Sequence, residues 1–322
     1  MSRYARQTAL PEVGPEGQAR LARAHVLVVG AGGLGCPVLQ YLAGAGVGEI
    51  TVMDPDLVEE SNLHRQPLYA MADIGAYKAE AARRRLLAAN PGVRLHPHAR
   101  ALDAANAGQA VRHADLVVDA ADSFAVSYIL SDECLAQGKP LISASVLGQS
   151  GYAGGFCGGA PSLRAVFPDL PAQAATCASA GVMGPAVGTI GALQAQMALQ
   201  VLLGQTPSPL GQMFTLRLAS LELGSFRFDQ ASEPSSPLPF TAATLLTPED
   251  LAVELRDPSE APKPAVPGAL RLPREALSAA ALPRDKRIVL CCQSGLRAWR
   301  AAAELRAAGY ENLALLAAGT AA

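Results

Sequence analysis

A glycine-rich turn and a later aspartate are the first residues of this chain that could do chemistry together. Residues 30–35 read GAGGLG, in which Gly30, Gly32 and Gly35 form the pattern G-x-G-x-x-G. Glycines at these positions let backbone N–H groups approach a phosphate, and the amino end of a following helix favours the negative charge of that phosphate. Asp54 ends the next apolar run and is placed to accept hydrogen bonds from ribose hydroxyls. On these features alone, the chain could bind a dinucleotide such as NAD.

A second group of polar residues favours a triphosphate over a dinucleotide. Residues 61–66 read SNLHRQ, and Lys78 follows them in a chain that contains only four lysines. The polar members of this group are Asn62, Arg65, Gln66 and Lys78. Gathered around one phosphate chain, they would stabilise the charge that builds on a departing pyrophosphate. Taken singly, Arg65 and Lys78 would each be interpreted as a solvated charge on a helix.

These residues need a sheet to hold them, and the apolar pattern predicts one. Short apolar runs alternate with helix-like segments, giving strands at 25–30, 49–54, 115–119 and 140–146 and helices at 36–46 and 76–89. Continuous apolar strands separated by helices imply a mostly parallel sheet that is covered on both faces. Asp122 follows a strand at the carboxyl edge, where ligands collect, and its carboxylate could hold Mg²⁺. The sequence therefore predicts an α/β fold with a Rossmann-like, mostly parallel sheet flanked by helices.

A cysteine near the C-terminus marks a second possible site. Cys292-Gln-Ser-Gly-Leu-Arg297 lies between an expected strand at 287–292 and an expected amphipathic helix at 296–309. Successive backbone N–H groups and the positive end of the helix would stabilise a thiolate or a persulfide on Cys292, and Arg297 adds charge. The alternative interpretation of this pattern is a cysteine that ends a strand by coincidence and has no chemical role. Upstream, Thr-Pro-Glu-Asp at 247–250 predicts a helix start, followed by a short strand.

A run rich in proline and serine divides the chain. Residues 229–241 read DQASEPSSPLPFT, which is typical of a linker. A length of 322 residues also suggests about two domains. We therefore expect a larger α/β domain over 1–232, a linker over 233–244 and a smaller α/β domain over 245–322.

The composition disfavours several classes of partner and location. The formal charge is −2 and aromatic residues make up 5% of the chain, so neither nucleic acid nor an anionic membrane is expected as a partner. Charged residues near the N-terminus leave no room for a secretory signal. The apolar stretches at 26–53 and 180–203 are interrupted by glycines and polar residues, which favours buried core elements over membrane spans. Six cysteines without C-x-x-C spacing favour reduced thiols in a cytoplasmic protein.

Several motifs, in order and with matching spacing, resemble the ThiF/MoeB family of ubiquitin-activating-enzyme-like adenylyltransferases. Within residues 1–225 they are RYARQ at 3–7, GAGGLG, the pair Asp54 and Asp56, SNLHRQ, Lys78 and DLVVDAADSF at 115–124. The resemblance implies a homodimeric enzyme that uses ATP and Mg²⁺. Such an enzyme would adenylate the C-terminal Gly-Gly carboxylate of a ubiquitin-like sulfur carrier protein and release pyrophosphate.

The resemblance also implies a role for each matching residue. Asp54 would hold the ribose, and Asp122 would hold Mg²⁺. Arg6 would reach into the ATP site of the partner protomer. Cys177, in TCASAGVMG at 176–184, would attack the acyl-adenylate or relay sulfur, although a buried structural cysteine is the alternative. The residues expected to bind the nucleotide are Gly30, Gly32, Gly33, Gly35, Asp54, Asn62, Arg65, Gln66 and Lys78.

One common feature of that family is missing. Members commonly carry two C-x-x-C pairs that bind a structural zinc ion. Ser162 and Ala165 occupy the positions of the first pair, and residues 230–236 hold no cysteine for the second. Serine and alanine cannot replace thiolate ligands, so we expect no structural zinc. Ser123 also replaces the asparagine that usually follows Asp122.

The C-terminal segment resembles a rhodanese. The matching stretches are VELRDPSE at 253–260, VPGALRLP at 266–273, IVLCCQSGLRAWRAA at 288–302 and GYENLALLAAG at 309–319. This resemblance implies that Cys292 carries a persulfide loaded by a donor such as a cysteine desulfurase or thiosulfate, whereas Cys291 would be structural. Glu254 stands where rhodaneses usually have an aspartate.

Together the two resemblances imply one reaction sequence. Adenylation gives the carrier's carboxylate a good leaving group, and the Cys292 persulfide then supplies sulfur, directly or through Cys177, to give a thiocarboxylate. Such carriers serve molybdopterin, thiamine or tRNA thiolation. Three alternatives stay open: an NAD-dependent oxidoreductase, a related adenylating enzyme that acts on a peptide or tRNA, and a nucleotide-binding scaffold without catalysis. The first does not require Arg6, Arg65 and Lys78, and the appended rhodanese argues against the second.

Overall fold

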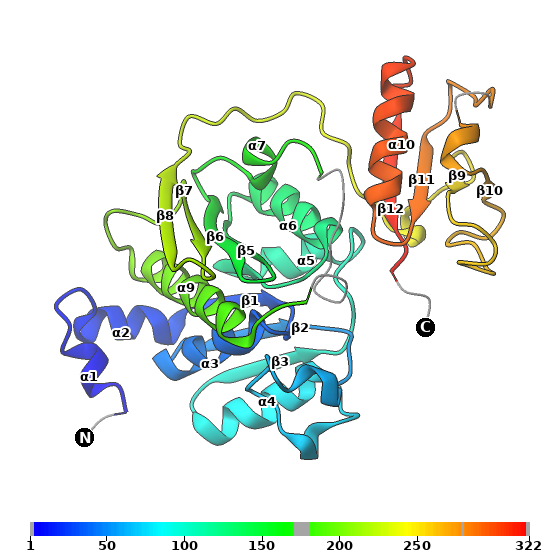
Figure 1. The fold of residues 1–322 in the computed structure, drawn as a ribbon. Helices are drawn as coiled ribbons and strands as arrows, with labels where there is room; N and C mark the ends of the chain where they lie inside the picture. The colour runs from blue at the N-terminus through cyan, green and yellow to red at the C-terminus, as the bar shows by residue number, and fades with distance from the viewer. Residues whose placement is uncertain (1–2, 171–180, 278–279, 320–322) are drawn as a thin grey trace.

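The chain folds into two units that lie side by side (Figure 1). A computed structural model describes residues 3–170, 181–277 and 280–319. The N-terminal unit is built on an eight-stranded sheet and the C-terminal unit on a four-stranded sheet. Strands alternate with helices in both units, which confirms the expected α/β fold with a second, smaller α/β unit.

The large sheet carries the glycine turn at the end of a central strand. Its strand order is β3-β2-β1-β4-β5-β6-β7-β8, with parallel pairing from β3 to β5 and antiparallel pairing from β5 to β8. The strands are β1 (His25–Val29), β2 (Glu49–Met53), β3 (Arg94–His98), β4 (Leu116–Asp119), β5 (Pro140–Leu147), β6 (Ser150–Cys157), β7 (Gln212–Arg217) and β8 (Glu222–Arg227). The chain leaves β1 for β2 on one side and returns to β4 on the other. The loops after β1 and β4 therefore meet at the position where open α/β sheets bind ligands.

Helices cover both faces of this sheet. Helices α3, α4 and α9 pack on the face that includes Val26 and Val28, and α5 and α6 pack on the face that includes Leu27 and Val29. The helices of this unit are α1 (Ala5–Thr8), α2 (Gly14–Arg23), α3 (Gly35–Ala45), α4 (Lys78–Ala89), α5 (Ala107–Arg112), α6 (Phe124–Gln137), α7 (Leu163–Val166) and α9 (Gly184–Leu203), with 3₁₀ turns η1 (Glu60–Asn62) and η2 (Met71–Asp73). Helix α9 is long and apolar enough to cross a membrane by length and composition, and 50% of its apolar window is buried inside the protein. It packs on α3, β5 and β6, as the core helix of an α/β unit does.

The C-terminal unit is a parallel sheet in the order β10-β9-β11-β12. Helix α10 packs on β11 and β12. The elements of this unit are η3 (Ala243–Leu245), β9 (Leu251–Glu254), β10 (Leu270–Arg271), η4 (Arg274–Ala276), β11 (Ile288–Cys292), α10 (Leu296–Ala307) and β12 (Leu313–Ala317). The loop that follows β11 therefore lies between a strand and a helix, as its sequence predicts.

The helix start expected at 247–250 is wrong, because these residues form a turn. The Asp250 carboxylate accepts the N–H of Thr247 (2.8 Å) and forms an ion pair with Arg287, which directly precedes β11 (2.7 Å). The hydrogen bond from Arg287 lowers the pKa of Asp250 to about 2. This ion pair ties the turn to the sheet, so the chain enters β9 at once.

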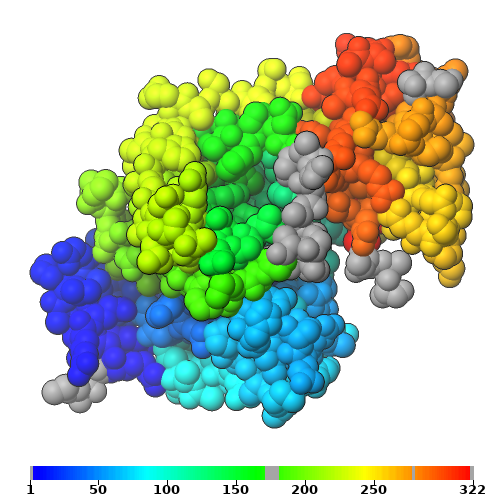
Figure 2. All heavy atoms as spheres, viewed as in Figure 1, coloured from blue at the N-terminus to red at the C-terminus, as the bar shows by residue number. Residues whose placement is uncertain are grey.

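The segment expected to be a linker is bonded to both units. Arg164 on α7 donates to the carbonyl oxygen of Leu238 (3.0 Å), and Arg306 on α10 donates to that of Ser236 (2.9 Å). One hydrophobic cluster also runs through both sheets. The two units are therefore packed together, and Figure 2 shows the orange and red lobe seated against the green one.

Candidate active site

The glycine turn packs too tightly to accept side chains. Gly30 has a φ of +97°, and a Cβ on it would lie 2.5 Å from the carbonyl oxygen of Ala120 in the loop after β4. A Cβ on Gly35 would lie 2.0 Å from the carbonyl oxygen of Gly30, and one on Gly33 would lie 2.5 Å from the side chain of Val187 on α9. These glycines hold the loops after β1 and β4 together and let α3 begin directly beneath the turn.

The structure brings Asp54 and Lys78 together beside this turn. The Asp54 carboxylate accepts the N–H of Ala31 (2.7 Å) and the N–H of Asp56 (2.9 Å). The Lys78 ammonium, on the first residue of α4, lies 2.8 Å from the Asp56 carboxylate, and Lys78 is 6% exposed. Burial raises the pKa of Asp54, and the charge of Lys78 opposes that rise. A lysine in this position can bind a phosphate that lies over the turn.

Gln66 is buried next to Gly32 and carries an unsatisfied oxygen. In the described part of the chain its Oε1 has no hydrogen-bond partner, and a Cβ on Gly32 would lie 3.7 Å from its Nε2. An amide oxygen accepts hydrogen bonds, so a ribose hydroxyl or an adenine amino group would satisfy it and a phosphate would not. The buried oxygen therefore favours a contact with the nucleoside over the supporting role at the phosphate chain that the sequence suggests for Gln66. Asn62 is also buried and caps η1 by accepting the N–H of Glu59 (3.4 Å). Arg65 follows η1 on the same stretch of chain.

Asp122 lies at the same edge of the sheet. It is exposed in the loop between β4 and α6, and Ala120 of that loop contacts Gly30. A cation held by this carboxylate would therefore lie near the glycine turn. Cys177, which the family resemblance singles out, lies outside the described residues.

Arg6 is not brought to the glycine turn of its own chain. It is exposed on α1, and the neighbouring Gln7 donates to the carbonyl oxygen of Ala45 at the last turn of α3 (3.0 Å). The glycine turn is at the opposite end of α3, and a helix of this length rises by roughly 16 Å. Arg6 therefore projects from a different end of the unit.

Sequence reasoning missed two side chains that hold the site in shape. The Tyr69 hydroxyl donates to the carbonyl oxygen of Ala31 (2.7 Å) and also contacts that of Lys78 (3.3 Å), which ties the glycine turn to α4. Gln194 on α9 donates to the carbonyl oxygen of Asp119 at the end of β4 (2.7 Å). No local pattern marks either residue, because their partners lie far away along the chain.

Asp119 is a fully buried acid beneath the loop after β4. Its carboxylate accepts hydrogen bonds from the Ser143 hydroxyl (2.7 Å) and the N–H of Ala121 (3.2 Å). Burial raises the pKa of Asp119 to about 6, and the charge of Asp122 adds to the rise. Folding therefore shifts this side chain toward its protonated form, which predominates only below about pH 6.

We expect Asp119 to make the free energy of unfolding depend on pH. Its folded pKa of about 6 lies above the ordinary value of 3.8, so the folded state binds the extra proton and stability falls as pH rises from about 4 through about 6. Asp119→Asn removes this titration. Across that window the stability of the variant relative to the parent chain should rise by on the order of 3 kcal/mol. Urea unfolding at a series of pH values measures the difference, and a difference that stays constant with pH would contradict the raised pKa.

The second site is the loop that follows β11. The Cys292 sulfur accepts N–H bonds from Gly295 (3.2 Å) and Ala298 (3.4 Å) at the amino end of α10. Cys292 is 1% exposed, and Arg297 pairs with Glu260 at the edge of the loop. Two backbone donors and a helix end stabilise negative charge on sulfur, as a thiolate or a persulfide requires.

Hydrogen bonds join the segments where the cysteine pairs are missing. The Ser162 hydroxyl accepts the N–H of Ala165 (3.2 Å) and donates to the Glu233 carboxylate (2.5 Å), and the Ser162 N–H donates to the same carboxylate (2.7 Å). Ser162 is 1% exposed. A serine and a glutamate thus hold together the two stretches of chain that the cysteines would have bridged. Within 3–170, 181–277 and 280–319, no group of three or more His, Cys, Asp or Glu side chains is arranged to hold a metal ion.

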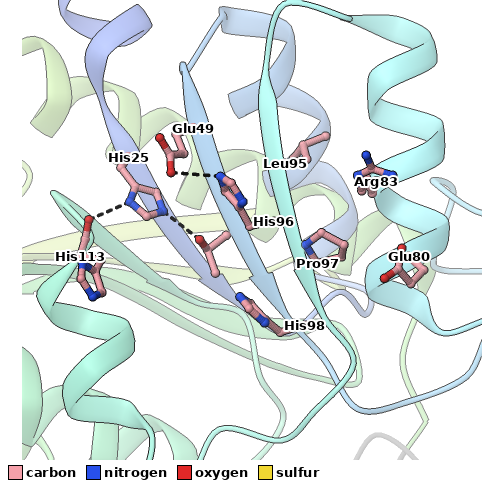
Figure 3. A pocket seen from close by; sticks show the side chains of 10 residues that line it. His25, Glu49, Glu80, Arg83, Leu95, His96, Pro97, His98 and His113 are labelled. Carbon is pink, nitrogen blue, oxygen red and sulfur yellow. Dashed lines mark hydrogen bonds and ion pairs between the residues drawn. The ribbon is translucent and has the colours of Figure 1, made fainter.

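A histidine-rich groove lies beside β1, β2 and β3 of the large sheet (Figure 3). Its volume is about 730 Å³, and its lining includes four of the chain's five histidines. The His25 ring contacts the carbonyl oxygen of His113 (2.7 Å) and the hydroxyl of Thr51 (2.8 Å), and His96 pairs with Glu49 (3.0 Å). His25 and Glu49 begin β1 and β2, whereas His98 ends β3 and Glu80 lies on α4, so the groove runs along β3 from the amino ends of β1 and β2. The residues that line it do not include those of the glycine turn.

Comparisons with known proteins relate both units to described families. The model of the ThiF family matches residues 4–238, and the model of the rhodanese-like domain matches residues 242–322. The chain is 47% identical over 212 residues to the sulfur carrier protein adenylyltransferase of Thermus thermophilus, with 63% of this chain and 78% of that protein covered. It is 31% identical over 360 residues to the probable adenylyltransferase/sulfurtransferase MoeZ of Mycobacterium tuberculosis, with 99% and 91% covered.

A solved structure shares the fold of the larger unit. The structure of E. coli MccB with MccA-N7isoASN has a TM-score of 0.63 and 25% sequence identity, covering 73% of this chain and 74% of that one. The ThiF model spans most of this chain, and a relative at 31% identity spans nearly all of it. The chain therefore belongs to the ThiF family and carries a C-terminal rhodanese-like domain.

Proposed function

We propose that this enzyme activates the C-terminal carboxylate of a ubiquitin-like sulfur carrier protein with ATP and converts it to a thiocarboxylate. Adenylation is assigned to residues 1–232 and sulfur transfer to residues 245–322, joined by the linker at 233–244. One observation carries the proposal: Lys78 lies beside the glycine turn of a chain that also cradles Cys292. Relatives named as sulfur carrier protein adenylyltransferase and adenylyltransferase/sulfurtransferase support it.

In the first half-reaction, ATP lies over the glycine turn. Asp54 and Gln66 face its nucleoside, while Arg65 and Lys78 face its triphosphate. A carboxylate oxygen of the carrier attacks the α-phosphorus, so a P–O bond forms and the bond to pyrophosphate breaks. The two cations stabilise the charge that builds on the departing pyrophosphate. Mg²⁺ held by Asp122 supplies further positive charge to the phosphates when it is bound.

In the second half-reaction, the terminal sulfur of a Cys292 persulfide attacks the carbonyl carbon of the acyl-adenylate. A C–S bond forms, the C–O bond to AMP breaks, and an acyl disulfide on Cys292 results. A thiol, either Cys177 or an external one, then attacks the Cys292 sulfur. The S–S bond breaks, and its electron pair leaves with the carrier as the thiocarboxylate. A second thiol reduces the new disulfide and regenerates the Cys292 thiol.

We propose that the enzyme works as a cytoplasmic homodimer without nucleic acid or membrane. Arg6 supports this assembly, because it is exposed and lies at the far end of α3 from its own glycine turn. In a dimer it would complete the nucleotide site of the partner protomer. The persulfide donor would be a cysteine desulfurase or thiosulfate, either of which can supply sulfane sulfur to a cysteine.

We propose that the ThiF unit is stable without zinc. Ser162 and Glu233 already join the two segments, around Ser162 and at 230–236, where the family's zinc-binding cysteines would lie. Chelators should leave the unfolding midpoint unchanged. Ser162→Ala removes a helix cap and a buried hydrogen bond, and it should lower the free energy of unfolding by about 1–2 kcal/mol. Ser220→Ala removes only an exposed contact to Arg217 and should cost less than about 0.5 kcal/mol. Urea unfolding measures both variants, and a midpoint that drops on chelation would refute the zinc-free proposal.

ATP–pyrophosphate exchange tests the proposed adenylation. Exchange should require a carrier with a free C-terminal Gly-Gly and should vanish when those glycines are deleted. Equal exchange with a short unrelated peptide would favour a peptide-activating enzyme. ATP binding without exchange, whichever carrier is added, would favour a scaffold without catalysis.

A further inference from the structure

A buried cation lies between the two units and is held by groups from both. Arg164 on α7 is 3% exposed. Its guanidinium donates two hydrogen bonds to the Asp132 carboxylate of α6, at 2.5 and 2.8 Å. It lies 4.7 Å from the ring centre of Tyr128 on α6 and 5.9 Å from that of Trp299 on α10. Because a cation over aromatic rings is most favourable where water is excluded, this cluster links the ThiF unit to the rhodanese-like domain.

The same guanidinium holds the linker that leads to the persulfide loop. Arg164 donates to the carbonyl oxygen of Leu238 (3.0 Å). Two residues further on, Phe240 forms a parallel bridge with Leu315 of β12. The Phe240 ring also presses on the loop itself, since a Cβ on Gly295 would lie 2.6 Å from it. Arg164 therefore fixes the linker immediately before it supports the loop.

Trp299 approaches the same loop from the helix side. Its backbone N–H donates to the carbonyl oxygen of Gly295 (2.8 Å), and its ring lies edge-on to Tyr128 with 5.8 Å between ring centres. Gly295 in turn donates to the Cys292 sulfur (3.2 Å). One side chain of the adenylating unit, Arg164, thus contacts the linker two residues before Phe240 and the ring of Trp299 on the helix that follows the Cys292 loop.

We propose that Arg164 is a positioning residue for sulfur transfer. It keeps the rhodanese-like domain docked on the ThiF unit, so the Cys292 persulfide holds a fixed position relative to the unit that forms the acyl-adenylate. This inference rests on the proposed function and goes beyond it, because neither adenylation nor loading of Cys292 requires the guanidinium. The expected defect of an Arg164 variant is confined to the step that joins the two half-reactions.

Trp299 makes the docking directly observable, because it is the only tryptophan in the chain. Arg164→Gln removes the cation, and the Asp132 side chain, already 38% exposed, can be hydrated in its absence. The variant should show tryptophan emission at longer wavelength and stronger acrylamide quenching. ATP–pyrophosphate exchange and loading of Cys292 by a small persulfide should match the parent chain, which establishes that both domains are folded.

Single-turnover transfer of sulfur from loaded Cys292 to an adenylated carrier is the decisive rate. It should fall by about tenfold or more in Arg164→Gln, since a misplacement of about 1 Å can cost up to about 100-fold. Arg164→Lys keeps the charge without the two-pronged ion pair and should recover part of the rate. If exchange or loading also fell in Arg164→Gln, exchange, loading and transfer would be measured in Arg164→Lys instead. A loss confined to transfer in that variant would support the positioning role, and an equal loss in all three would overturn it.

The matched control is Arg284→Gln. Arg284 lies 4.5 Å from the ring centre of Tyr310, and both residues belong to the rhodanese-like domain. This variant should change neither the emission of Trp299 nor the transfer rate. Parent-like transfer in an Arg164 variant with exposed Trp299 would overturn the need for docking, and unchanged emission would overturn the role of Arg164. Absence of transfer in the parent chain would instead refute the proposed function, so the two failures are distinguishable.

Discussion

Replacement of Lys78 by alanine should reduce ATP–pyrophosphate exchange by about 100- to 1,000-fold. The Lys78 ammonium is buried at the start of α4, whereas its partner Asp56 has a side chain that is 63% exposed. An ion pair with so exposed a partner contributes at most about 1 kcal/mol, so a triphosphate can take over the ammonium readily. Removing that charge leaves the departing pyrophosphate with one cation fewer at the moment when its charge builds.

Lys139→Ala is the control for this experiment. The Lys139 ammonium donates to the carbonyl oxygen of Ala114 (2.7 Å), and Lys139 precedes β5 at the amino edge of the sheet. Its removal should leave exchange unchanged. Exchange at the parent rate in Lys78→Ala would contradict a role at the triphosphate and would favour the scaffold without catalysis.

Replacement of Cys292 by alanine should abolish sulfur transfer and leave adenylation intact. The carrier should then accumulate as its adenylate, because the electrophile forms and no persulfide arrives. Pyrophosphate release in a single turnover and thiocarboxylate formation, measured on the same sample, separate the two effects. Full sulfur transfer by Cys292→Ala would show that the rhodanese-like domain has another role.

Cys291→Ala provides a neighbour-matched control. Cys291 packs in a different hydrophobic cluster from Cys292, and burial raises its pKa to about 12. A thiol with such a pKa stays protonated and is a poor nucleophile. Transfer should therefore survive in Cys291→Ala, and its loss would mean that the strand, and not one sulfur atom, sets the activity.

The parts of the fold that the sequence could predict depend on local chemistry. The glycine turn is an example, because Gly30 adopts a positive φ and Gly35 packs against the turn. Only glycine meets both requirements, so the residue types in the sequence already indicate the turn. The same holds for the cysteine loop, where a strand and a helix flank the thiol. The helix expected at 247–250 failed because Arg287, far along the chain, binds Asp250 and favours a turn.

The parts that could not be predicted depend on neighbours that only the fold supplies. Tyr69 and Gln194 act through carbonyl groups of distant segments, so no spacing rule reveals them. The docked linker is another case, since its composition is that of a spacer, yet Arg164 and Arg306 bond to its backbone from opposite units. The roles of Arg6 and Cys177 stay predictions, because they concern a partner protomer and a segment outside the described residues.

Intact mass spectrometry of a Gly-Gly-ended sulfur carrier protein tests the central claim most directly. The carrier would be incubated with this enzyme, Mg-ATP and a persulfide donor. We predict that sulfur replaces one oxygen at the C-terminus of the carrier, and that this mass gain requires both ATP and Cys292. A carrier of unchanged mass, under conditions where Cys292 is loaded and ATP is bound, would contradict the assigned reaction.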